Sequence, residues 1–178
     1  KTAKKMRDTG SPYGYVAMGS TMVCTAEAYC SIGGMSRKKA TEDFYFLQKL
    51  AKFCGVCTIP EILVYPSARP ISRVYLGTGF RMEQAKKGFD INSLYYSNFA
   101  FLLLSKWLNL GSNGWKIDLS MLMKKVAEIH IDLIDFLKKE GLENIWNNLR
   151  KNAPTKLHFS RQFHRWFDAL KTIRFLKH

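Results

Sequence analysis

Hydrophobic side chains recur at helical spacing over most of the second half of the chain. Residues 91–110 are apolar on most of their circumference, which predicts a largely buried helix that a Gly-Ser-Asn-Gly turn ends. Either Asp118 or Ser120 can cap a second, long helix that runs to Lys139 and stops at Gly141. Its apolar residues lie three or four positions apart, so that one stripe faces inward. These two helices belong to a predicted helical bundle.

The end of the chain continues the helical pattern, with a short helix over residues 142–151 and a last helix over 157–177. The last helix has a cationic side that holds Arg161 and Arg165, opposite an apolar stripe. The stripe consists of Phe159, Phe163, Trp166, Leu170 and Ile173. Rings at helical spacing are usually core, so we expect the three aromatic residues of this stripe to be buried.

The first half of the chain has a weaker pattern. Residues 9–36 are rich in Gly, Ser and Thr, which indicates loop or short strands. Ser36 can cap a helix over 37–53, whose apolar positions recur at three- and four-residue steps. Residues 61–65 and 72–76 are short, β-branched and aromatic, and bounded by Pro and Gly, so they predict the two strands of a hairpin.

The sequence therefore predicts a mainly α fold with two parts. Residues 1–80 would form a small N-terminal module with loop, one helix and a short β-hairpin, which zinc could stabilise. Residues 81–178 would form a helical bundle that ends in a basic helix. The length of 178 residues and the apolar content of 47% suffice for a core.

The chain is strongly basic, with 28 Lys and Arg against 14 Asp and Glu and a net charge of +14. Half of this excess lies in residues 150–178, where eight Lys and Arg face one acid, Asp168. Such an excess indicates an anionic partner, namely nucleic acid, an acidic protein or an anionic membrane surface. Aromatic rings lie among the cations, of which we expect Phe175 and, upstream, Trp115 to be the more exposed. Cations with flat rings suit phosphates and stacked bases.

The candidate nucleic-acid contacts are the cations at three places: before the first helix, around the predicted hairpin, and in the last helix. They are Arg37, Lys38, Lys39, Arg69, Arg73, Arg81, Lys156, Arg161, Arg165, Lys171 and Arg174. Two other interpretations remain open. A basic helical face can be only a solvated surface, and the arginines around the hairpin can pair with Glu61 and Glu83.

Four cysteines fall in two pairs, Cys24-x5-Cys30 and Cys54-x2-Cys57. Four thiolates can complete a tetrahedral zinc site, and the second pair has the tight spacing that such sites use, whereas the first pair is wider than usual. The alternatives are inert buried thiols, a redox pair, or two disulfides. A redox pair is disfavoured because it would begin a helix rather than follow one, and disulfides require an oxidising compartment.

Catalytic signals are weak. Glu128, Asp132 and Asp135 would share one face of the long helix, but lysines four residues away indicate salt-bridged surface instead. His158 and His164 could be general bases of a nuclease, yet no acidic cluster accompanies them in the sequence. We therefore expect a protein that is not an enzyme.

The longest apolar run, residues 99–104, is much shorter than the roughly 18 residues that span a bilayer, so no membrane span is expected. The cationic N-terminus does not resemble a secretory signal, and we expect a cytoplasmic location.

These observations favour a non-catalytic protein that binds RNA or DNA through phosphate contacts. It would act with other protein subunits in a larger nucleoprotein complex, as ribosomal proteins and subunits of RNA-guided effectors do. Alternatives are a DNA-binding regulator of a mobile element or phage, a nuclease-type enzyme, and a protein of the membrane surface.

Overall fold

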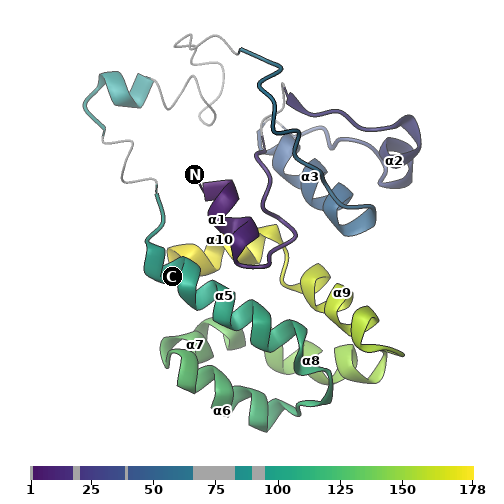
Figure 1. Cartoon of the computed structure of the whole chain (residues 1–178), viewed down its shortest axis with the longest axis vertical. Helices are drawn as coiled ribbons and strands as arrows, with labels where there is room; N and C mark the ends of the chain where they lie inside the picture. Colours follow the sequence, from purple (N-terminus) through teal and green to yellow (C-terminus); the bar gives the residue numbers. More distant parts are fainter. Residues whose placement is uncertain (1, 18–20, 39, 66–82, 90–94) are drawn as a thin grey trace. The chain divides into compact units, whose positions relative to one another are not determined.

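A computed structural model describes residues 2–17, 21–38, 40–65, 83–89 and 95–178 (Figure 1). The chain groups into two compact units. One, here called the bundle, combines residues 1–14 with residues 96–178, and the other consists of residues 15–95. The boundary that we predicted after residue 80 lies outside the described residues and stays a prediction.

The bundle confirms the predicted mainly helical class. Its elements are α1 (Thr2–Asp8), α5 (Asn98–Ser112), the 3₁₀ helix η3 (Gly114–Lys116), α6 (Leu119–Ile129), α7 (Asp132–Lys139), α8 (Leu142–Lys151), α9 (Lys156–Trp166) and α10 (Ala169–Lys177). Side-chain caps determine the residues at which several of these helices begin. The Ser97 hydroxyl accepts a hydrogen bond from the Ala100 amide, and the Asp118 carboxylate accepts one from the Met121 amide. Each cap satisfies an amide that the first helical turn leaves without a partner.

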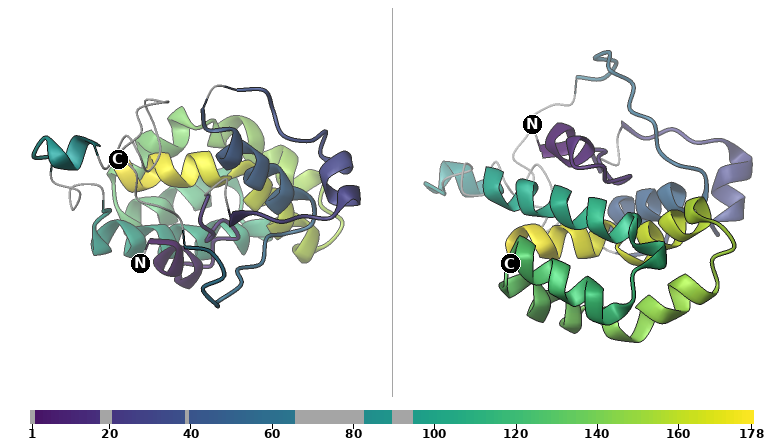
Figure 2. Two further views of the ribbon diagram at one scale, coloured as in Figure 1. Left: turned by 90° about the horizontal axis from the view of Figure 1, so that it is seen from above. Right: turned by 60° about the horizontal axis from the view of Figure 1, so that its bottom comes forward.

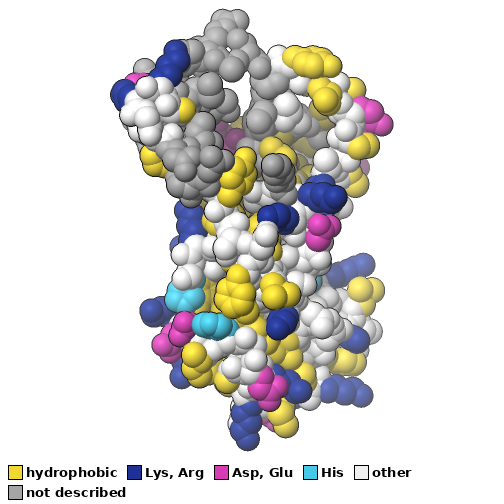
Figure 3. Space-filling model, turned by 60° about the vertical axis from the view of Figure 1, so that its left-hand side comes forward, with side chains coloured by type: hydrophobic (Ala, Val, Ile, Leu, Met, Phe, Trp, Pro, Cys, Tyr) yellow, Lys and Arg dark blue, Asp and Glu magenta, His cyan; other side chains and the backbone are white. Residues whose placement is uncertain are grey.

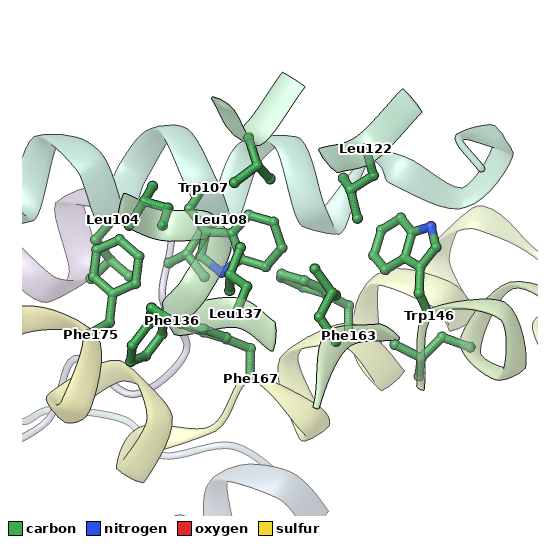
Figure 4. Packing of buried hydrophobic residues seen from close by; sticks show 14 of the residues in the cluster. Leu104, Trp107, Leu108, Leu122, Phe136, Leu137, Trp146, Phe163, Phe167 and Phe175 are labelled. Atoms are coloured by element: carbon green, nitrogen blue, oxygen red, sulfur yellow. The ribbon is translucent and has the colours of Figure 1, made fainter. Parts of the chain in front are cut away.

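Helix α5 is the centre of the bundle, because α1, α6, α9, α10 and η3 all pack on it (Figures 1 and 2). Leu104 and Trp107 have no exposed surface, and Leu108 has almost none. Figure 4 shows side chains from α6 to α10 converging on these residues. The Trp107 ring meets the rings of Phe163 and Phe167 edge to face, with centroids 5.5 and 5.8 Å apart. Such aromatic pairs add to the gain from burying their area.

The prediction of one long helix up to Lys139 is wrong, because the helix is interrupted at His130. This residue is extended (φ −168°, ψ 134°), and α7 starts two residues later. An unbroken helix over residues 119–139 would be about 31 Å long, whereas α5 is about 22 Å long. The break lets α7 fold back on α6, with which it packs. Gly141 is left-handed (φ 83°), as predicted.

The single last helix predicted over residues 157–177 is also wrong. The chain bends at Phe167 and Asp168, and the Asp168 carboxylate starts α10 by accepting hydrogen bonds from the amides of Leu170 and Lys171. The bend allows both α9 and α10 to pack on α5.

The buried rings differ in part from the prediction. Phe159 and Phe163 are fully buried, as expected, and Trp166 is partly buried against the same core. Phe175, expected to be exposed, is buried against Phe136 and Phe167. Trp115, the other ring expected at the surface, packs partly buried on the core.

The unit of residues 15–95 contains α2 (Ala26–Ser31) and α3 (Glu42–Phe53), which pack together around Phe46, Leu47 and Leu50. Helix α3 begins at Glu42 rather than at residue 37, and Ser36 does not cap it. The physical reason is charge: two acids lie in the first turn of α3, whereas a run of cations at that end would oppose the helix dipole.

The predicted β-hairpin is not supported. Residues 61–65 form no strand, and residues 72–76 lie outside the described residues. The Gly- and Ser-rich stretch contains α2 besides loop.

No helix within the described ranges is both long and apolar enough to cross a membrane.

A buried carboxylate joins the end of α7 to α10. Glu140, with 9% of its side chain exposed, accepts a 2.8 Å hydrogen bond from Lys171 Nζ and a 3.2 Å hydrogen bond from Arg174. Burial raises the pKa of this carboxyl, but the hydrogen bonds and charges of Lys171 and Arg174 outweigh burial and hold the pKa below its ordinary value of 4.5. The ionised form of Glu140 therefore stabilises the fold.

A glycine in α5 allows close packing with α9. A Cβ on Gly111 would lie 2.2 Å from a ring atom of Phe163, which is fully buried and cannot yield. We expect Gly111→Ala to destabilise the bundle by about 1–3 kcal/mol through overpacking, although Gly to Ala in a helix ordinarily stabilises. Urea unfolding measures this free energy. The control, Lys106→Ala on the exposed side of α5, should change it by less than about 0.5 kcal/mol. A stabilised Gly111→Ala protein would contradict this packing.

Glu140→Gln removes the charge that Lys171 and Arg174 share, and we expect it to lower the free energy of unfolding at pH 7 by about 1–3 kcal/mol. Because the folded pKa of Glu140 is lowered, its contribution is complete above about pH 4.5 and is lost as the pH falls through the folded value. The difference between wild type and variant should therefore shrink below about pH 4.5 in urea unfolding at a series of pH values. A difference that stays constant down to pH 3 would show that the ion pairs do not stabilise the fold.

Candidate nucleic-acid interface

Helix α9 has a well-defined start and a well-defined inner side. The Thr155 hydroxyl accepts a hydrogen bond from the His158 amide, so the helix begins at Lys156. Phe159 and Phe163, four residues apart, are fully buried and fix the rotation of the helix. The outer side then presents the positions opposite these two rings, which include the exposed Arg161 and Arg165.

We call His158, Arg161 and Arg165 the α9 basic face; Lys156, nine residues before Arg165, lies on the opposite side of the helix. The two arginines are one helical turn apart, about 6 Å along the axis. No Asp or Glu occurs in α9, and within the described residues neither Lys156 nor Arg161 forms an ion pair. No carboxylate of α9 itself therefore balances the positive charge of this face.

Other cations are spread over both units. Figure 3 shows one side of the molecule, on which Lys and Arg side chains lie among hydrophobic, uncharged and acidic side chains. The α9 basic face differs in that two arginines project from adjacent turns of one acid-free helix.

Two predicted contacts of α10 form ion pairs within the fold, and their binding to nucleic acid stays a prediction. Lys171 and Arg174 both bind Glu140, and the Lys171 ammonium also lies 5.8 Å from the centre of the Trp166 ring. Glu140 was missed from the sequence, because its partners lie 31 and 34 residues further along the chain. No local pattern signals such a contact.

The two histidines of α9 lie partly buried. His158 Nε2 is 3.1 Å from the Gln162 side-chain nitrogen. In the described part of the chain, the Nδ1 atoms of His158 and His164 are buried without a hydrogen-bond partner. Burial lowers the pKa of His164 from its ordinary value of 6.5, so this ring is neutral at pH 7. Neither ring is paired with a carboxylate of the described residues, which a general base in a catalytic dyad would need.

The N-terminal part of the predicted site belongs to the unit of residues 15–95. Arg37 and Lys38 are exposed ahead of α3, and the Lys38 ammonium lies 3.8 Å from the centre of the Tyr45 ring. Four further predicted contacts, Lys39, Arg69, Arg73 and Arg81, lie outside the described residues.

The four cysteines that we predicted as zinc ligands are all exposed and not in disulfides. Among the residues that the structure describes, no three or more His, Cys, Asp or Glu side chains gather closely enough to hold a metal ion. Cys24, Cys30, Cys54 and Cys57 are thus not assembled as a site, and zinc binding stays a prediction. The acidic residues Glu128, Asp132 and Asp135 do not form such a group either.

The unit of residues 15–95 also has an apolar hollow of about 440 Å³ that the sequence did not predict. Its lining includes Met22, Leu47 and Val56, together with the exposed Ile59 and Ile62. These residues come from separated segments, so no periodic pattern marks them.

No protein-family model matches the chain, and neither a curated protein nor a solved structure is similar to it.

Proposed function

We propose that this protein binds nucleic acid without catalysing a reaction on it, and that the α9 basic face contacts the phosphate backbone. The observation that supports this proposal most is the pair of exposed arginines on adjacent turns of a helix that contains no acid. Guanidinium groups bind phosphate oxygens with two donors at once, which makes arginine well suited to this role.

The charge of the whole bundle supports the same proposal. Its residues include eighteen Lys and Arg but only eight Asp and Glu. Like charges on a compact unit repel one another and cost stability. Binding to a polyanion relieves this repulsion and releases the counterions that surround the phosphates. This excess of positive charge therefore suits a protein that binds a polyanion.

Action in a larger nucleoprotein complex is a further part of the proposal, for which the composition is the argument.

The direct test is Arg161→Ala combined with Arg165→Ala. We expect weaker binding to every nucleic-acid sequence tried, and a decrease of about one to two in the slope of log affinity against log salt, because two phosphate contacts are lost. Fluorescence anisotropy at several salt concentrations measures both quantities.

The matched control is Lys124→Ala combined with Lys139→Ala, which removes the same charge from exposed positions of α6 and α7. This control should keep most of the salt slope, and thermal unfolding should show that both double variants are folded. Equal losses in the two double variants would mean that net charge, and not the α9 basic face, determines binding.

A further inference from the structure

We infer that the α9 basic face recognises double-stranded nucleic acid and prefers it to unpaired strands. This inference rests on the proposed function and names its substrate class.

The phenylalanine rings of the basic segment, residues 150–178, are not available to stack on bases. Phe159, Phe163 and Phe167 have no exposed surface, and Phe175 is 4% exposed. Phe163 and Phe167 are stacked on each other inside the core, with centroids 6.2 Å apart. Proteins that bind single strands usually stack bases on exposed aromatic rings, which contributes about 1–3 kcal/mol per base. The segment has the cations of such a protein but not its stacking surface.

The remaining rings of the segment do not replace those four. Trp166 packs against the core and under Lys171. The imidazoles of His158 and His164 are partly buried, and the His158 ring is engaged by Gln162. The exposed His178 packs its ring against Phe136, with centroids 5.3 Å apart. Among the described residues of the bundle, the large aromatic side chain that is mostly exposed is Phe99, at 57%. It belongs to the first turn of α5 and packs edge to face with His130 rather than lying on α9.

The groups that α9 does expose are suited to a fixed array of phosphates. Arg161 and Arg165 project from a rigid helix that two buried phenylalanines hold in place. A duplex presents one phosphate charge per roughly 1.7 Å of its axis, whereas one strand presents a charge per about 3.4 Å. Each phosphate contact also releases more counterions from a duplex than from a single strand. Because base stacking does not favour the single strand here, the higher phosphate density and the larger counterion release favour the duplex.

The test measures binding of the full chain to a 20-base-pair duplex and to each of its separate strands, by fluorescence anisotropy at one salt concentration. Duplexes of DNA and of RNA are both used, with two unrelated sequences of each. We expect at least about fivefold tighter binding to the preferred duplex than to either of its strands, and little difference between sequences, because the contacts are to phosphates. Arg161→Ala with Arg165→Ala should weaken duplex binding, and Phe99→Ala should leave binding to the strands unchanged.

Equal or tighter binding to the single strands would overturn this inference while leaving the proposed function in place. A loss of strand binding in Phe99→Ala would overturn it too, because it would show that a ring stacks on bases. Absence of binding to duplexes and strands alike would overturn both the inference and the proposed function.

Discussion

The structure of the bundle depends on the burial of α5, whose apolar residues occupy most of its circumference. Trp107 is the largest of them, and it is enclosed by Phe163 from α9 and by Phe167 from the bend that follows. Covering α5 requires helices on several sides, which explains why the chain breaks at His130 and again at Asp168. The same burial sets the rotation of α9. Because Phe159 and Phe163 must point inward, Arg161 and Arg165 must point outward.

The charges follow from this arrangement. A core made of rings and aliphatic side chains leaves the cations at the surface, where Lys171 and Arg174 of α10 bind Glu140, whereas α9 contains no acid of its own. Lys171 and Arg174 thus contribute to the stability of the fold. The same core explains how a basic segment rich in phenylalanine can lack a surface for stacking bases.

Local patterns predicted much of the fold. The bounds of α8 were predicted correctly, and Asp118 was one of the two caps predicted for α6, because hydrophobic spacing and capping residues act within one or two turns. The two helix breaks were missed, since the apolar stripe continues through each of them and periodicity does not report a change of direction. The ion pairs of Glu140 were missed because their partners are distant in the sequence. For the candidate site, Arg161 and Arg165 could be placed outward from the sequence, whereas the burial of Phe175 depends on the bend at Asp168 and could not be anticipated.

Arginine-selective chemical modification shows whether the α9 basic face contacts phosphates. The protein is treated with phenylglyoxal with and without bound nucleic acid, and peptide mass spectrometry gives the extent of modification at each arginine. The account predicts strong protection of Arg161 and Arg165 and little change at Arg174, which binds Glu140. Arg150, whose Nε donates to the Trp115 carbonyl, should also change little. Protection confined to other arginines, or equal at all of them, would contradict the account.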